Sequence, residues 1–441
     1  MNKLLILLIL SFFSTQGYAA SCPDGSEPEK TVSADGSYFE YKCDDKQKSD
    51  IKLAPTSNLV DLKPTSGPVN FKAREAELRE NNIDIYWRCS YSGSVPSPQE
   101  YVQTSNVYGG NDRSLEDSGQ LLIGLARGCF GENSNTDQTC QKAKNYLLTM
   151  AKNGSPKKEI SNLNRSEVLE KYTINTYFLP QATMLTATLD YKNYFKPSEA
   201  QLLKKWLYNL AVSYRRDHSN SKRVKYSKHG HDSLERAQNH YIGSASAQMS
   251  VGSYIDDKNL FDVGVNQWFE TLSTMREDGS LPSETSRGSR AIWYTGITLT
   301  QLMRLAEIAR SEEFDLYDVV VKGKTYHDAV KFMLDVSEQP DLIYQYAEYD
   351  VFSGGNIPHT VQEHSPPSGG QYSWVAPYVV RFPDHPNTKR IIEYRDNPNT
   401  EIKRLLAQYQ GIHLLRVVQA SRPKIKKNYT YLHLNSHCFI E

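Results

Sequence analysis

Two segments near the middle of the chain carry side chains that could act together on an acidic substrate. The first contains Asn239 and His240, which stand side by side among small and apolar residues. The second, DGSLPSETSRGSRAIWY at residues 278–294, contains Arg287 and Tyr294. An amide, an imidazole and a guanidinium can bind a carboxylate, and a phenol can transfer a proton. In the simpler alternative, the Asn-His pair and the tyrosine only pack in the core.

A turn followed by a helix is expected to position the second segment. The Asp-Gly pair at its start is typical of a turn, and from Arg290 onward apolar residues recur every three or four positions. Arg287 should therefore lie just before the helix, with Arg290 and Tyr294 one turn apart on the same face. Cations near a phenol favour its ionised form, which suits Tyr294 for proton transfer. Alternatively, both arginines pair with Glu284 and the tyrosine has only a structural role.

Asn239 and His240 are expected on a helix over residues 233–255. Asp232 has the features of an N-cap and is followed three positions later by Glu235, a pattern typical of a helix start. The small residues that follow His240 would let neighbouring helices approach closely.

A basic segment, residues 215–231, comes just before this helix. It holds six Lys or Arg residues and one acidic residue, in a chain whose 51 basic and 51 acidic residues balance. We expect either a solvated loop or a surface that binds an anionic partner through Arg216, Arg223 and Lys225. Arg290 is a further candidate for binding that partner.

Helical periodicity recurs over most of the chain. Apolar residues three or four apart predict helices over residues 114–126, 137–152, 174–189, 198–215, 233–255, 260–275, 290–310, 324–336 and 401–418. Residues 344–386 are rich in Gly and Pro, which favours loops or short strands. Successive helices joined by polar loops indicate an all-α domain of antiparallel hairpins, arranged as a bundle, a solenoid or a toroid.

Composition and the first residues limit the class of protein. The balanced charge argues against a nucleic-acid-coating protein, and the 39% hydrophobic content argues against disorder. An apolar run over residues 4–13, followed by Gly17 and Ala19, predicts a signal peptide of residues 1–19. The run is too short to span a bilayer. We therefore expect a periplasmic or secreted protein without membrane insertion.

The six cysteines lack the CxxC spacing of a zinc site and predict disulfides. Six cysteines allow fifteen connectivities; pairing of neighbours gives Cys22–Cys43 and Cys129–Cys140, and leaves Cys89 for Cys438. Residues 20–75 then form an irregular N-terminal extension stapled by a disulfide, and residues 76–441 form the helical domain. His229 and His231 have no second ligand cluster nearby, so no metal site is expected.

Together, Asn239-His240 and the pattern DG.LP.E..RG.RA..Y at residues 278–294 resemble the motifs of the alginate lyase superfamily of polysaccharide lyases. The resemblance implies an incomplete (α/α) toroid that acts on an anionic polysaccharide and needs no cofactor. It also implies that Asn239, His240 and Arg287 neutralise the substrate carboxylate and that Tyr294 is catalytic. Family members carry further polar residues after the Asn-His pair, whereas Tyr241 follows here, which leaves the substrate preference open.

The implied reaction is β-elimination on a 1,4-linked polyuronate. Removal of the C5 proton and loss of the O4 leaving group build negative charge on the C6 carboxylate, which must be stabilised. In mannuronate and glucuronate H5 and O4 lie on the same side, so Tyr294 can serve both steps, whereas guluronate needs a second base such as His240. We expect an exported alginate lyase that prefers mannuronate. The alternatives are a glucuronan lyase, a non-catalytic polysaccharide-binding protein, and a glycoside hydrolase using Glu284 and Glu235.

Overall fold

The computed structural model describes residues 29–32, 39–42, 67–80, 89, 95, 114–132, 135–156, 174–215, 223–225, 232–234, 239–348, 358–360, 362, 373–396 and 438–439. The chain divides into two compact units, Met1–Lys52 and Leu53–Glu441. The predicted signal peptide, the Cys22–Cys43 pairing, His229 and His231, and the helix over residues 401–418 lie outside the described residues.

The first unit contains a β-hairpin where the sequence predicted irregular structure. Strand β1 (Glu29–Val32) pairs antiparallel with β2 (Phe39–Lys42), with Glu29 opposite Lys42 and Val32 opposite Phe39. The expected boundary of the extension at residue 75 is also displaced. Helix α2 (Phe71–Glu80) crosses that position, and its Phe71 and Leu78 are buried in the core of the second unit.

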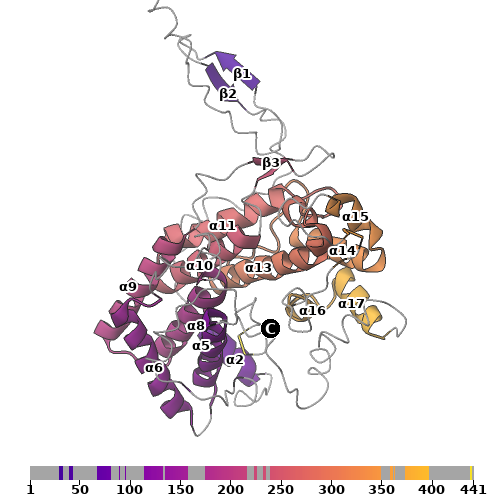
Figure 1. The fold of residues 1–441 in the computed structure, drawn as a ribbon. Helices are drawn as coiled ribbons and strands as arrows, with labels where there is room; N and C mark the ends of the chain where they lie inside the picture. The colour runs from indigo at the N-terminus through magenta and orange to yellow at the C-terminus, as the bar shows by residue number, and fades with distance from the viewer. Residues whose placement is uncertain are drawn as a thin grey trace, which may run out of the picture. The chain divides into compact units, whose positions relative to one another are not determined.

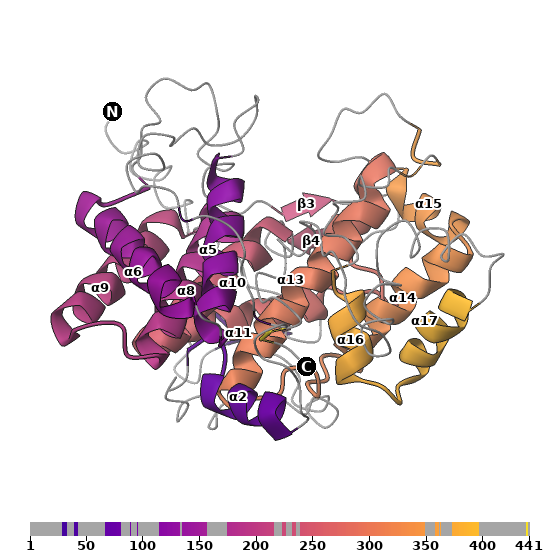
Figure 2. The ribbon, with the colours of Figure 1, turned by 90° about the horizontal axis from the view of Figure 1, so that it is seen from below.

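The second unit is built from helices (Figures 1 and 2). In chain order, after α2, these are α5 (Ser114–Phe130), α6 (Thr136–Asn153), the π-helical turn η3 (Ile174–Phe178), α8 (Leu179–Tyr191), α9 (Pro197–Tyr214), α10 (Asn239–Ile255), α11 (Lys258–Ser273), α12 (Pro282–Thr285), the 3₁₀ turn η5 (Gly288–Arg290), α13 (Ala291–Ser311), α14 (Tyr326–Glu338), α15 (Asp341–Ala347), α16 (Val375–Arg381) and α17 (Pro386–Asp396). Most of the predicted helices that the structure describes are present within a few residues of their expected ends. None of the described helices is long and apolar enough to cross a membrane.

Two predictions of local structure are wrong. The predicted helix start at Asp232 is instead strand β4 (Asp232–Leu234), paired antiparallel with β3 (Arg223–Lys225), and α10 begins only at Asn239. Residues 344–386 contain most of α15 and all of α16 at their two ends, where Trp374 and Tyr378 are buried in the core, whereas Gly354 to Gly370, on which the loop prediction rested, lie between these helices.

Helix α10 lies between two hydrophobic clusters. The first unites α2, α5, α6, α8 and α9, and takes Ala247 and Val251 from α10. The second unites α11, α13, α14, α15, α16 and α17, and takes Ile242 and Met249. Because α10 is buried on both sides, its first residue is held in a fixed position relative to both clusters.

The C-terminal tail is tied to the first cluster by a disulfide. The predicted bonds Cys89–Cys438 and Cys129–Cys140 are both present. Arg74 of α2 donates from Nε to the carbonyl oxygen of Cys438 at 3.0 Å, and the ring of Phe439 packs edge-on against Phe71. Residues close to the C-terminus thus complete the core around α2.

Removal of the tail disulfide is expected to cost more stability than removal of the local one. Cys89→Ser with Cys438→Ser opens a link across 349 positions, and the loss should be about 2–4 kcal/mol, seen as a lower thermal midpoint. The matched pair Cys129→Ser with Cys140→Ser opens a separation of only 11 and should lose less. The reverse order in calorimetry would contradict the role assigned to the tail.

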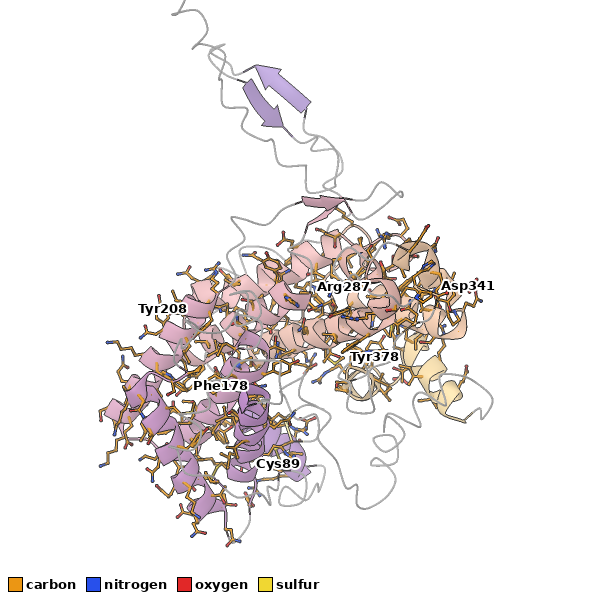
Figure 3. The ribbon with its side chains drawn as sticks, viewed as in Figure 1. Cys89, Phe178, Tyr208, Arg287, Asp341 and Tyr378 are labelled. Carbon is orange, nitrogen blue, oxygen red and sulfur yellow. A yellow bond between two sulfur atoms is a disulfide. The ribbon has the colours of Figure 1, made fainter. Side chains whose placement is uncertain are left out.

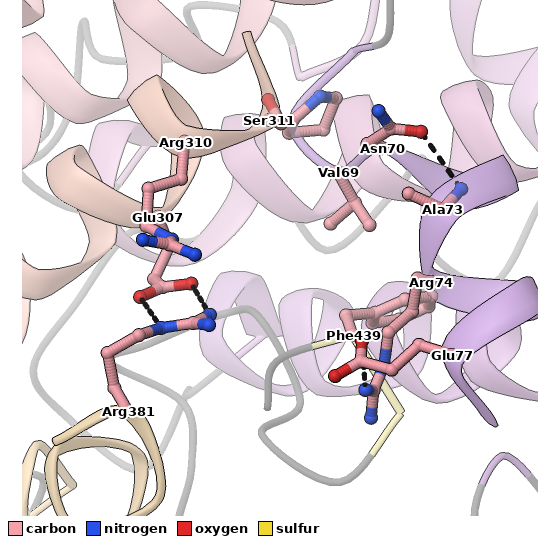
Figure 4. Close-up of a pocket in the computed structure, with 11 residues that line it drawn as sticks. Val69, Asn70, Ala73, Arg74, Glu77, Glu307, Arg310, Ser311, Arg381 and Phe439 are labelled. Atoms are coloured by element: carbon pink, nitrogen blue, oxygen red, sulfur yellow. Dashed lines mark hydrogen bonds and ion pairs between the residues drawn. The ribbon is translucent and has the colours of Figure 1, made fainter. Parts of the chain in front are cut away.

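A pocket of about 150 Å³ lies at the C-terminal end of α13, between α2 and α16 (Figure 4). Glu307 of α13 accepts from Arg381 of α16 through both carboxylate oxygens, at 3.2 and 2.6 Å. Glu307 lies nearly four helical turns, roughly 20 Å, beyond Tyr294 on α13. This pocket is therefore remote from the predicted catalytic residues.

Two stacked histidines join α14 to the α16–α17 segment. The rings of His327 and His385 are 4.3 Å apart, and their Nδ1 atoms lie 2.8 and 3.1 Å from the Tyr378 hydroxyl. Asn387 donates its backbone N–H to His385 Nδ1 at 3.1 Å. Burial lowers the pKa of His327 to about 4, with the charge of His385 acting in the same direction, and burial also lowers the pKa of His385.

This cluster predicts a loss of stability in acid. An unfolded histidine titrates near about 6.5, so between that pH and about 4 the unfolded chain binds more protons than the folded one at His327. The free energy of unfolding should therefore fall as pH drops through this window, by on the order of 1 kcal/mol at this partly exposed site. In urea titrations from neutral to mildly acidic pH, His327→Phe should flatten that slope; an unchanged slope would contradict the assignment.

Candidate active site

The N-terminal ends of α10 and α13 and the short helix α12 meet at the candidate site, which contains the buried Arg287 labelled in Figure 3. Asn239 is the first residue of α10 and is fully buried. Arg287 precedes η5 and is 6% exposed. Tyr294 lies in the first turn of α13 and is half-buried. Both motifs predicted from the sequence are thus found at helix starts.

Glu284 of α12 joins the two motifs. Its Oε1 accepts from the backbone N–H of Asn239 at 2.7 Å, and its Oε2 accepts from Asn239 Nδ2 at 3.1 Å. The first amides of a helix lack intrahelical partners, so this carboxylate caps α10 from 45 residues away. Its position explains why α10 begins at Asn239 and not at the local N-cap pattern.

The carboxyl of Glu284 is fully buried. Burial raises its pKa above the ordinary value, and the positive charge of Arg287 and the hydrogen bonds from Asn239 offset only part of that rise. Glu284 was predicted as a partner of the arginines or as a hydrolase carboxylate. The first role agrees with the charge of Arg287 beside it. The second does not fit a side chain that is fully buried and bound through both oxygens.

Arg287 stacks on Tyr294. Its guanidinium carbon lies 3.8 Å from the centre of the phenol ring, and the Trp293 ring stacks on Tyr294 at 5.7 Å. Gly288 has φ +57, so the chain can turn sharply between Arg287 and the helix. The sequence predicted two cations near the phenol, Arg287 and Arg290, and the one that stacks on the ring is Arg287.

For the remaining predicted site residues, the structure gives the element in which each one lies. His240 and Arg290 are half-buried, next to Asn239 and at the end of η5. Arg223 and Lys225 belong to strand β3, whose partner β4 lies against α12. Arg216 lies outside the described residues. Strand β3 of the basic segment is therefore paired with β4, which lies next to the helix that carries Glu284.

Arg276 links α12 to α15, a role that no pattern in the sequence predicted. Its Nη1 donates to the hydroxyl of Thr285 at 2.8 Å, and its guanidinium stacks on Tyr346 of α15 at 4.0 Å. The Tyr346 hydroxyl in turn donates to Asp278 Oδ2 at 2.8 Å. Gly279 has φ +86 and lies so close to the backbone of Asp328 that no side chain would fit. These contacts explain the Asp-Gly turn of the motif.

Gln362 was also missed, because no local pattern marks it. Its Oε1 accepts from the backbone N–H of Ile292 at 3.1 Å, and its Nε2 donates to the carbonyl oxygen of Gly288 at 3.0 Å. A residue far along the chain thus caps the start of α13 and fixes the turn that carries Arg287. Among the described residues, no group of three or more His, Cys, Asp or Glu side chains could hold a metal ion.

A family model described as alginate lyase matches residues 96–343. The chain is 24% identical over 226 residues to a polysaccharide lyase of Stenotrophomonas maltophilia, covering 51% of this chain and 61% of the relative. It is 30% identical over 119 residues to an alginate lyase of Pseudomonas putida, covering 27% of this chain and 29% of the relative. The match therefore spans less than two thirds of the length of these relatives.

Solved structures show the same fold. Alginate lyase A1-III from Sphingomonas species A1 covers 76% of this chain and 93% of its own, with 20% identity and a TM-score of 0.55. A variant of alginate lyase A1-III in complex with a tetrasaccharide covers 75% of this chain and 92% of its own, with 18% identity and a TM-score of 0.56. The likeness confirms the predicted all-α toroid of helical hairpins.

Proposed function

The chain belongs to the alginate lyase family, and we propose that it is a polysaccharide lyase that cleaves alginate by β-elimination, with a preference for mannuronate. The observation that carries the proposal is the meeting of Asn239, Arg287 and Tyr294 around the buried Glu284. A cation and an amide at one point can neutralise a carboxylate, and a half-exposed phenol next to them can move a proton. A protein that only binds polysaccharide has no need of a phenol stacked on a cation.

In the proposed reaction, Asn239, His240 and Arg287 bind the C6 carboxylate of the uronate. Tyr294, as phenolate, removes the C5 proton; the electron pair of that C–H bond forms the C4=C5 double bond, and the C4–O4 bond breaks. Tyr294 then donates the proton to the departing O4. The charge that builds on the carboxylate is stabilised by groups already in place, so little reorganisation is needed as the reaction proceeds.

The proposed substrate preference follows from this single proton-transfer group. Mannuronate and glucuronate place H5 and O4 on the same side, within reach of one phenol, whereas guluronate requires His240 as a second base. The tetrasaccharide bound by a variant of alginate lyase A1-III supports an oligosaccharide as the ligand of this site. Glucuronan has the same stereochemistry at C4 and C5 and is the alternative substrate.

Ultraviolet absorbance from the new C4=C5 double bond tests the function directly. Purified mature protein is incubated in parallel with poly-mannuronate, poly-guluronate and glucuronan. We expect the fastest rise with poly-mannuronate. A faster rise with glucuronan would move the assignment to that polymer, and no rise with any of the three would overturn the proposal.

We further propose that the protein is exported, which sequencing of the mature N-terminus near residue 20 tests.

The basic segment, residues 215–231, is proposed to bind flanking uronates. Arg216→Ala, Arg223→Ala and Lys225→Ala together should raise KM by about tenfold with little change in kcat, since each charge contact is worth about 0.2–1 kcal/mol. The effect should shrink at high salt. A matched control removes three exposed lysines from α6 and α9, Lys142, Lys152 and Lys205, and should leave KM unchanged. An equal KM in both triple variants would show that the basic segment is a solvated surface that does not bind the substrate.

A further inference from the structure

Glu284 is a buried carboxylate to which the proposed proton transfer gives no role. It is fully buried on α12, and both of its oxygens accept hydrogen bonds from one residue, Asn239. A bond to the backbone fixes where α10 begins, and a bond to the side chain fixes the rotation of the amide. Together, the two hydrogen bonds from Asn239 to Glu284 fix both the start of α10 and the rotation of the Asn239 amide.

The same carboxylate is also coupled to the second motif. Arg287, three residues further along, is the positive charge that stabilises the ionised form of Glu284. Arg287 in turn stacks on Tyr294 at 3.8 Å. A buried carboxylate is costly without such compensation, so its presence between the amide and the cation needs a reason beyond packing.

The hydrogen bonds show which end of the amide the carboxyl binds. Both Glu284 oxygens accept from N–H groups of Asn239, so the carboxyl faces Nδ2 and not Oδ1. One N–H of the Asn239 amide is then used by Glu284, and the second remains for another acceptor. Asn239 Oδ1 is buried and has no hydrogen-bond partner among the described residues. Glu284 therefore leaves one N–H and the oxygen of this buried amide unused.

We propose that Glu284 is a positioning residue of the reaction, which holds the Asn239 amide in the one orientation that directs its second N–H at the substrate carboxylate. The inference rests on the proposed function. With the amide fixed before the substrate binds, no rotation is needed while charge builds on the carboxylate. A freely rotating amide would present its oxygen to that carboxylate for part of the time and repel it.

Glu284→Gln tests the role with the least change in shape. The Gln oxygen can still accept from the Asn239 backbone N–H, but its Nε2 then meets Nδ2, donor against donor. The amide must turn or move away. We expect kcat to fall by about 10- to 100-fold with KM within about threefold, because the misplaced group acts mainly in the transition state.

Thr285→Val is the matched control on the same helix. Thr285 is fully buried and accepts from Arg276 at 2.8 Å, so this variant also removes a buried hydrogen-bond partner from α12. It should lower the thermal midpoint and leave kcat of the folded enzyme unchanged. If Glu284→Gln has the kcat of the wild type, the positioning role is overturned.

A swap tests whether the two side chains are paired. In Glu284→Gln combined with Asn239→Asp, the Gln Nε2 donates to the new carboxylate, so the hydrogen bonds and the net charge are restored. We expect the thermal midpoint to recover above that of either single variant. A midpoint no higher than that of the single variants would show that the two side chains are not paired, and would overturn the inference.

A spectroscopic measurement is independent of turnover. In protein labelled with ¹⁵N in asparagine, the side-chain amide of Asn239, identified by its loss in Asn239→Asp, should give two well-separated proton signals. Glu284→Gln should shift them and Thr285→Val should not. Unshifted signals in Glu284→Gln would show that Glu284 does not hold the Asn239 amide, and would overturn the inference. If the signals shift in Glu284→Gln but the wild type is inactive, the proposed function is overturned and with it the role of Glu284 in the reaction, while its contact with the amide stands.

Discussion

Tyr294→Phe is expected to reduce kcat on poly-mannuronate by about a hundredfold or more, while the thermal midpoint changes little. The substitution removes only the hydroxyl and keeps the ring on which Arg287 stacks at 3.8 Å. General acid and base catalysis typically contributes about 10²–10⁴-fold, so loss of the group that serves both steps should remove at least the lower figure. A tyrosine that only packs would lose about 1 kcal/mol of stability from one hydrogen bond.

Tyr208→Phe is the control for this substitution. Tyr208 lies on α9 with 42% of its surface exposed, away from the candidate site (Figure 3). The same chemical change there should alter neither kcat nor the midpoint. If Tyr294→Phe behaved like Tyr208→Phe, Tyr294 would not be the proton-transfer group.

Arg287→Ala is expected to have the second large effect, a loss in kcat on the order of 10²–10³-fold. The guanidinium is the proposed partner of the substrate carboxylate, and it is also the charge that stabilises Glu284. Removal of the partner of a buried charge is strongly destabilising, by about 3–5 kcal/mol, so the thermal midpoint should fall as well.

Arg287→Lys separates the two contributions. The lysine keeps the positive charge but loses the planar group that stacks on the phenol and can bind a carboxylate through two N–H groups. Stability should largely recover, and kcat should remain more than about tenfold below the wild type. Arg310→Ala, which removes an arginine paired with Asp315 at the far end of α13, should change neither quantity much. Full activity in Arg287→Lys would reduce the role of Arg287 to a buried counter-charge.

The sequence predicts well those features that depend on local patterns. Apolar spacing locates α11 and α14 to within about two residues, because a helix that buries one face must repeat its apolar residues along that face. The two motifs also predict that Arg287 comes before a helix and that Tyr294 lies in its first turns. Two of the disulfides follow from the order of the cysteines along the chain.

Features that depend on distant partners are not predictable in this way. The N-cap pattern at Asp232 looks complete, but pairing of β4 with β3 and the remote cap from Glu284 move the helix start to Asn239. The stacking of Arg287 on Tyr294 requires the η5 turn, which no spacing rule reveals. Gln362 caps α13 from a stretch whose Gly and Pro content predicts only loops. Each of these features depends on a tertiary contact that no local pattern marks.

We propose that this chain breaks the polymer by elimination and not by hydrolysis. Digestion of poly-mannuronate in water labelled with heavy oxygen, followed by mass spectrometry of the products, distinguishes the two reactions. Elimination adds no water, so the fragments should carry no label from bond cleavage, and each new non-reducing end should be unsaturated and lighter by one water. Heavy oxygen at one new end per cleavage, with saturated sugars at both ends, would identify a hydrolase and contradict the account.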